Sequence, residues 1–424
     1  MTMVLHLRYK RKTQPGRLLW LICLLPFCFG VLLDLLHCPD AVKYILDLSW
    51  LGLLVFLLRF RCQVIWKGLN GIMCWILAFF SITLAVYAVQ YRSGLYYLWG
   101  LRNNFRFYVV FFAAALFWTA SEITDFWKTI EGLFWIDVAV SLIQYGFFGY
   151  EQDFLGGLFG IRSGVNGYTN LFFAIVVSHS LVCYLANKES ALSSGCKCAA
   201  ALIVAAMAEM KFFFVEFPVI LALAVLFSRR TFREFWVVFS GFWAVFSGVW
   251  LLSALFPGWG DWFSLEGVWQ VAADQKGYTS SGDLNRLTAI SMINARFFGS
   301  FWQKLFGFGL GNCDMASYSF LTTPFSRDYQ HLHYHWMSHA FLYLETGWVG
   351  LTFFFGFFLL VFCQAGRLER WCDGGGVVDC RVARIMAVVC AMTGIYNASL
   401  RSEPGYLAYL VLALPFAYGR DRHG

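Results

Sequence analysis

The sequence reads SSGDLNRLTAI at residues 280–290, LFGFGLGN at 305–312 and YHWMSHAFLYLETGWVGL at 334–351. These pieces belong to one long polar stretch, which interrupts an apolar sequence and then leads straight back into it. Such a stretch between apolar runs is typical of a large loop that lies outside a membrane. We therefore expect a substrate site in this part of the chain.

The composition indicates a polytopic membrane protein. Hydrophobic residues make up 59% of the chain, aromatic residues 20% and charged residues 13%, and the mean hydropathy is +0.62. These values lie far outside the range of soluble globular domains. The formal net charge is +7, but the basic residues form short clusters between apolar runs. This pattern argues against a nucleic-acid partner, which would need a continuous basic surface.

A helix needs about 20 apolar residues to cross the hydrocarbon core of a bilayer. Windows of that length predict about twelve transmembrane helices and an all-α integral membrane bundle. The predicted spans are Leu18–Leu36, Lys43–Leu58, Gly71–Gln90, Phe107–Ala120, Gly132–Gly149, Asn170–Ala186, Cys198–Ala208, Phe212–Phe227, Phe235–Leu255, Met337–Cys363, Ile385–Ala398 and Tyr406–Tyr418.

Basic residues next to the spans predict the orientation, because Lys and Arg are retained on the cytoplasmic side. Clusters follow every second span, beginning with Arg8–Arg17 before the first one, and this alternation places both termini inside. It also requires Glu209–Lys211 to form a tight outer hairpin in which Lys211 pairs with a glutamate. The resulting parts are N-terminal helices (1–255), a large outer loop (256–335) and C-terminal helices (336–424).

A set of arginines falls on the outer side, against the usual bias of short outer loops. Arginine presents a planar fork of donors that matches phosphate oxygens, so these residues suggest a clamp for a polyprenyl diphosphate. The alternative is that they reach lipid headgroups or pair with Glu151, Asp153 and Asp283. The predicted clamp consists of Arg286, with Arg102, Arg106 and Arg162 as further members.

Two histidines and one carboxylate stand where the polar stretch returns to the bilayer. A sugar hydroxyl that attacks an anomeric carbon needs a base, and histidine titrates near neutral pH. We predict His339 as the base, with His335 assisting and Glu345 orienting it. If the segment is helical, the two histidines share one face. The alternative is that both rings lie at headgroup level and that Glu345 pairs with an arginine.

These motifs resemble the O-antigen ligase/polymerase superfamily. The resemblance rests on Gly282–Leu287 with Arg286, on the glycines of FGFGLGN (306–312), and on the return segment that ends in Glu345, Gly347 and Trp348–Leu351. Where that superfamily carries a His-Asn pair, Trp336 follows His335 and Ala340 follows His339. Either histidine can therefore inherit the role.

The resemblance implies a GT-C-like glycosyltransferase of the bacterial cytoplasmic membrane. It would polymerise undecaprenyl-diphosphate-linked repeat units into O-antigen, capsule or exopolysaccharide. A ligase that transfers glycan to lipid A core, and a flippase of a different class, are the alternatives. Expected partners are the lipid-linked glycan, membrane lipids, a flippase and chain-length regulators. The thirteen cysteines show no metal-like spacing, so we expect neither metal nor cofactor.

Overall fold

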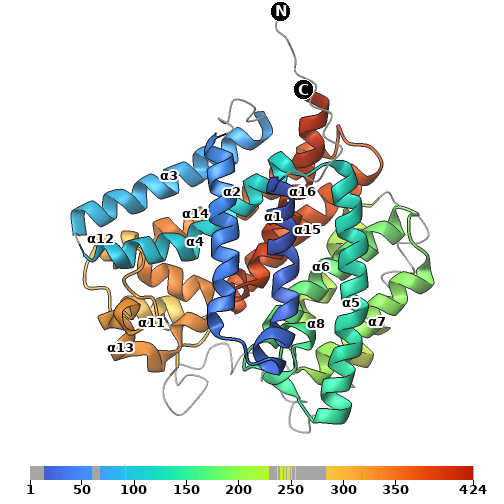
Figure 1. The fold of residues 1–424 in the computed structure, drawn as a ribbon, viewed down its shortest axis with the longest axis horizontal. Helices are drawn as coiled ribbons and strands as arrows, with labels where there is room; N and C mark the ends of the chain where they lie inside the picture. The colour runs from blue at the N-terminus through green and yellow to red at the C-terminus, as the bar shows by residue number, and fades with distance from the viewer. Residues whose placement is uncertain are drawn as a thin grey trace, which may run out of the picture.

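A computed structural model describes residues 14–59, 67–90, 92–228, 283–316 and 318–423, with isolated residues between 236 and 254. Within these ranges every regular element is a helix (Figure 1). A helix lies at each predicted span except Phe235–Leu255, which falls largely outside the described residues. The longer helices are α1 (Gln14–Leu24), α2 (Tyr44–Arg59), α3 (Lys67–Gln90), α4 (Gly94–Phe117), α5 (Ala120–Phe148), α6 (Asn166–Leu185), α7 (Ala191–Met207), α8 (Phe213–Leu226), α14 (Ser338–Leu368), α15 (Gly375–Tyr396) and α16 (Pro404–His423).

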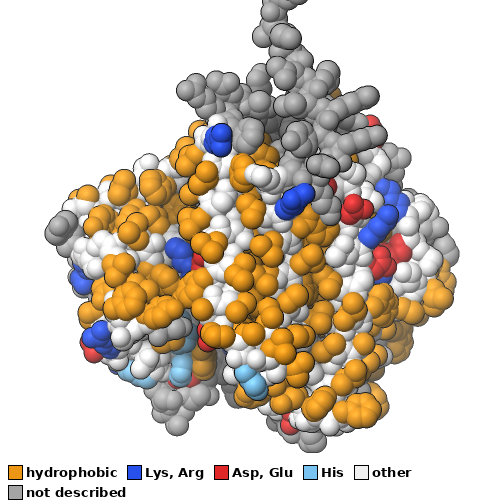
Figure 2. All heavy atoms as spheres, in the orientation of Figure 1, with side chains coloured by type: hydrophobic (Ala, Val, Ile, Leu, Met, Phe, Trp, Pro, Cys, Tyr) orange, Lys and Arg blue, Asp and Glu red, His pale blue; other side chains and the backbone are white. Residues whose placement is uncertain are grey.

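Five helical segments of the described chain are long and apolar enough to cross a bilayer. Exposed hydrophobic side chains cover the face of the bundle seen in Figure 2, as expected for a surface that meets lipid. The architecture is therefore that of an all-helical membrane protein, as predicted. The five segments are Asp40–Arg59, Leu69–Gln90, Ala120–Phe148, Asn166–Leu185 and Ser338–Leu368.

The first predicted span is not one continuous α-helix. The first span continues from α1 into a 3-10 turn, Leu25–Cys28, and a π-helical segment, Gly30–Leu35. Pro26 stands at the start of the 3-10 turn, where it cannot donate a backbone hydrogen bond. The turn predicted at Glu209–Lys211 is present, because α7 ends at Met207, Glu209 has a φ of 53° and α8 begins at Phe213. Its location on the outer side of the membrane stays a prediction.

Helix α16 lies at the centre of the bundle, and its apolar residues from Tyr406 to Ala417 are almost completely buried. A helix that is apolar on all sides needs neighbours all round, and α4, α6, α14 and α15 supply them. Tyr409 of α16 stacks on Phe357 of α14, with ring centroids 5.3 Å apart. This packing fixes the helices that carry the site.

The predicted outer loop is described from residue 283 onward and folds into short helices against the bundle. The two ends of its described part meet, because Leu284 donates a backbone hydrogen bond to the carbonyl of Leu332 at 3.1 Å. The short helices are α11 (Ala289–Arg296), α12 (Phe301–Phe306), η7 (Ser319–Leu321), α13 (Pro324–Tyr329), η8 (Gln330–Leu332) and η9 (Tyr334–Trp336).

Two glycines join this outer segment to α14. Gly347 breaks α14 with a φ of 60° and a ψ of −158°, and Gly307 ends α12 with a φ of 65°. A Cβ on Gly307 would lie 2.5 Å from the carbonyl carbon of Glu345, and a Cβ on Gly347 would overlap the carbonyl of Leu305. The two backbones therefore touch at a point that admits only glycine on either side.

We predict that Gly347→Ala lowers the thermal stability of the purified protein in detergent. The φ of 60° and ψ of −158° at this position belong to a region that essentially only glycine adopts, so alanine costs about 1–3 kcal/mol before the overlap with the Leu305 backbone is counted. Gly132→Ala in α5 is the matched control, because no atom lies within 4 Å of the added Cβ and alanine favours a helix. A Gly347→Ala protein that melts at or above the wild-type temperature would contradict the proposed contact.

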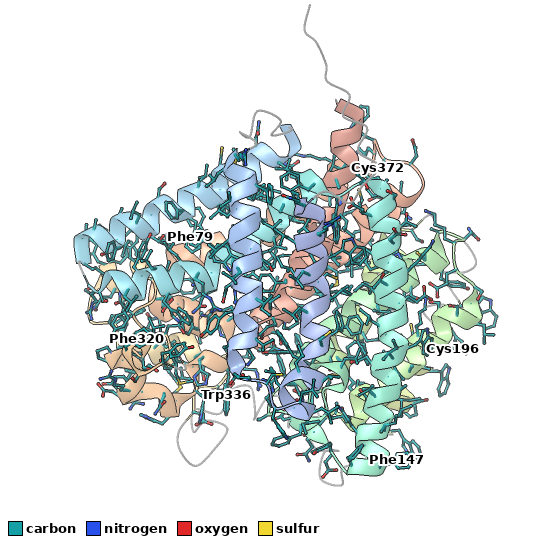
Figure 3. The ribbon with its side chains drawn as sticks, viewed as in Figure 1. Phe79, Phe147, Cys196, Phe320, Trp336 and Cys372 are labelled. Carbon is teal, nitrogen blue, oxygen red and sulfur yellow. The ribbon has the colours of Figure 1, made fainter. Side chains whose placement is uncertain are left out.

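The end of α16 and the turn around Cys372 lie at the opposite end of the bundle from α13 (Figures 1 and 3). This arrangement gives the predicted orientation a direct test. In a background without native cysteines, we expect an impermeant maleimide to label Gln330→Cys in intact cells and Asp373→Cys only after lysis. Both positions are exposed. Labelling of Asp373→Cys alone in intact cells would reverse the orientation.

Candidate functional site

Arg286 lies between the start of α14 and the end of α15. Its Nε donates to the carbonyl of Tyr396 at 2.8 Å, and its guanidinium carbon lies 4.1 Å from the centroid of the Tyr396 ring. The guanidinium is thus oriented by one backbone acceptor and one aromatic face. An arginine held in this way keeps the donor geometry that suits phosphate oxygens.

Lys211, in the hairpin between α7 and α8, reaches the surroundings of Arg286. Phe212 stacks on Tyr396, with ring centroids 4.1 Å apart and planes 5° from parallel, so the hairpin is packed against the residue that orients Arg286. Burial, and to a smaller extent the charge of Arg286, lower the pKa of the Lys211 ammonium to about 8, although Glu209 at 3.6 Å opposes the shift. The expected lysine–glutamate pair is present, but its closeness to Arg286 was not predicted.

His339 holds the backbone of Arg286. Its Nε2 lies 2.9 Å from the Arg286 carbonyl oxygen, which can only accept, so Nε2 carries the proton in this contact. The side chain is buried, with 5% of its surface exposed, in the first turn of α14. His339 therefore positions the arginine-bearing segment.

His335 does not share a helix with His339, so the prediction of a common face is wrong. His335 belongs to η9, and Met337 is extended (φ −125°, ψ 123°) before α14 begins at Ser338. Burial, His333 and Arg401 lower the pKa of the His335 imidazole to about 4. His335 is less buried than His339 and is neutral at pH 7.

The carboxylate of Glu345 faces the glycine loop. Its Oε1 accepts from the backbone N–H of Cys313 at 3.2 Å, while its own carbonyl accepts from Gly309 at 2.9 Å. Glu345 is fully buried, and its Oε2 has no hydrogen-bond partner in the described chain. The FGFGLGN segment and Cys313 thus surround Glu345. Among the described residues, neither His335 nor His339 hydrogen-bonds to this carboxylate, which was predicted to orient the base.

A second polar cluster, which the sequence did not predict, surrounds Arg401. Its guanidinium carbon lies 3.4 Å from the centroid of the Phe341 ring, and burial lowers its pKa while the nearby Asp314 and Glu345 carboxylates raise it. Asp314 accepts from Nδ2 of Asn103, and burial raises the pKa of this carboxyl. Only contacts between distant segments reveal this cluster.

The other predicted arginines pair with carboxylates of the N-terminal helices. Arg102 donates to both oxygens of Asp47, at 3.0 and 2.6 Å, and Arg106 lies 3.9 Å from the same carboxylate. Nε of Arg162 lies 3.3 Å from Asp34. These three arginines thus pair with Asp47 and Asp34, and not with the acidic residues named as the alternative in the sequence analysis. These pairs fix α2 and the segment before α6 beside the site.

In the described part of the chain, no group of three His, Cys, Asp or Glu side chains is arranged to hold a metal ion. The ionisable side chains that the structure brings to this region are the cations Arg286 and Lys211, the two histidines and the buried carboxylates. No protein-family model matches the chain, and no curated protein matches it either.

We predict that the affinity for a polyprenyl diphosphate falls as the pH rises from 7 to 9. The Lys211 ammonium, whose pKa is about 8, loses its proton in this interval, and the anion loses one partner. The expected loss is about 10-fold for one charge-assisted hydrogen bond. Lys211→Arg should remove this pH dependence, because arginine stays charged.

Lys304→Arg, on the exposed face of α12, is the control and should leave the pH dependence in place. Binding is measured by quenching of the intrinsic tryptophan fluorescence in detergent. An affinity that falls equally in wild type and Lys211→Arg would exclude Lys211 from the site.

Proposed function

We propose that the protein is a membrane glycosyltransferase that takes a glycan from a lipid diphosphate. The observation that carries this proposal is that Arg286 and the hairpin of Lys211, which come from segments far apart in the chain, both pack against Tyr396. Glu209 pairs with Lys211, and the additional positive charge of Arg286 favours an anion that contacts both cations. A diphosphate leaving group supplies that anion, and it gains negative charge as the glycosidic bond breaks.

The surrounding residues suggest how the transfer proceeds. His339 keeps Arg286 in place through the backbone, so the arginine can hold the diphosphate without rearrangement. His335 is the more accessible histidine, and we assign it the role of base toward the acceptor hydroxyl. A bound diphosphate raises the pKa of His335 from about 4 toward neutrality, because negative charge favours the imidazolium.

The resemblance of the motifs to the O-antigen ligase/polymerase superfamily suggests the substrates. As a polymerase, the protein would use a second undecaprenyl-diphosphate-linked repeat unit as acceptor. The site would then work at the outer face of the bacterial cytoplasmic membrane, where such units accumulate. The buried cluster of Arg401, Asp314 and Glu345 would support the site from behind by fixing the glycine loop.

We predict that Arg286→Ala lowers polymerisation about 30- to 1000-fold, because a charge-assisted contact to the leaving group contributes about 2–4 kcal/mol in the transition state. The purified protein is reconstituted with lipid-linked repeat units, and product length is followed on gels. Arg296→Ala is the matched control, since Arg296 is an exposed arginine on α11.

Wild-type chain lengths from Arg286→Ala would contradict the assignment. Transfer to lipid A core, with no transfer between repeat units, would show a ligase. If the wild-type protein instead moved lipid-linked glycan across the bilayer without joining it, the enzyme proposal would fail.

The two histidines should affect different steps. His335→Gln is expected to lower turnover about 10²- to 10⁴-fold with little change in donor affinity, as for loss of a base. His339→Gln should mainly weaken donor binding, because it loosens the backbone of Arg286. The exposed His331→Gln is the control. Full turnover in His335→Gln, with donor binding intact, would remove this residue from the mechanism.

A further inference from the structure

A second polar pocket lies at the opposite end of the bundle, beside Cys372 (Figure 3). Its volume is about 710 Å³, and it opens between the end of α14, the following turn and the start of α15. It lies far from the glycine loop and takes no part in the proposed transfer. The charged residues that line it are Glu369, Arg370, Asp373, Arg381 and Arg384.

The buried charges of this pocket do not balance. Nε of Arg381 donates to Oε1 of Glu369 at 2.7 Å, and Arg384 donates to Oε2 at 2.9 Å. All three side chains are largely buried: Arg381 is 14% exposed, Glu369 18% and Arg384 19%. Among the described side chains of this buried group, one carboxylate thus serves two guanidinium groups, so the positive charges exceed the negative charge by one. Arg370 and Asp373 are exposed to solvent at the mouth of the pocket.

Arg384 is prepared to bind a further anion. Its guanidinium carbon lies 3.7 Å from the centroid of the Phe227 ring and 4.9 Å from that of Phe362, so aromatic rings fix its plane. Its Nε is buried and has no hydrogen-bond partner in the described chain. Glu369 holds Arg381 beside it. Two oriented guanidinium groups with donors to spare form a suitable receptor for phosphate oxygens.

We propose that this pocket binds a phosphate group of single negative charge. A phospholipid headgroup and a free phosphate share this chemistry. Basic pockets between transmembrane helices are a known setting for anionic headgroups. Such a ligand neutralises the excess charge of the Arg381–Glu369–Arg384 group and clamps the ends of α14 and α15 together.

The test measures the melting temperature of the full-length protein in nanodiscs of phosphatidylcholine, with and without phosphatidylglycerol, and in phosphatidylcholine with added inorganic phosphate. We expect phosphatidylglycerol to raise the melting temperature of the wild type. Arg384→Gln leaves a one-to-one pair of Arg381 and Glu369, so the variant should fold and should lose this response. Its apparent affinity for phosphatidylglycerol should fall about 10-fold or more.

Arg381→Gln leaves the pair of Arg384 and Glu369 intact. This variant should also lose the response to phosphatidylglycerol, and it replaces Arg384→Gln in the test if that variant does not fold. Arg367→Ala removes an exposed arginine of the same helix end and should respond like the wild type. A rise with phosphatidylglycerol alone assigns the site to lipid, and an equal rise with inorganic phosphate assigns it to free phosphate. Absence of any rise in the wild type, or a rise that persists in both glutamine variants, would overturn the proposal.

Discussion

The contact between Gly307 and Gly347 is the constraint on which the outer part of the structure depends. Because both residues have positive φ and lack Cβ atoms, α14 can break where the end of α12 crosses it. The break turns the backbone of Leu344 and Glu345 toward the glycine loop, where Phe308 and Gly309 donate to their carbonyls. This close backbone contact, together with the hydrogen bond of Tyr343 to Asn294, joins the loop segment to α14.

The glycine loop FGFGLGN (306–312) also contacts α4. A Cβ on Gly100 of α4 would lie 2.6 Å from the backbone nitrogen of Gly311, so this loop is wedged between α4 and α14. That position explains why the glycines are closely spaced, and it also buries Glu345 beside Asp314 and Arg401. The glycines of this loop therefore serve packing and the cradle of one carboxylate. Substrate recognition depends on side chains from other segments.

The length of the apolar runs predicted most of the helices, since spanning a bilayer imposes both length and composition. The hairpin at Glu209 could also be predicted, because basic clusters must alternate across the membrane. The start of α14 could not, since Met337 precedes it without a side-chain cap and no local signal separates His335 from the helix. The pairing of Asp47 with Arg102 joins different helices, so spacing along the chain does not reveal it. No sequence motif sets Arg401 apart, and only its tertiary contacts with Phe341 and the nearby carboxylates distinguish it.

The proposed function depends on Arg286 and Lys211 forming a single anion site. A double-mutant cycle on the affinity for undecaprenyl diphosphate tests it most directly, with Arg286→Gln, Lys211→Gln and both together. Residues that bind one ligand group jointly should show a coupling energy of about 0.5–3 kcal/mol, so the double variant binds little worse than the weaker single variant. Strictly additive losses, or unchanged affinity in all three variants, would contradict the claim.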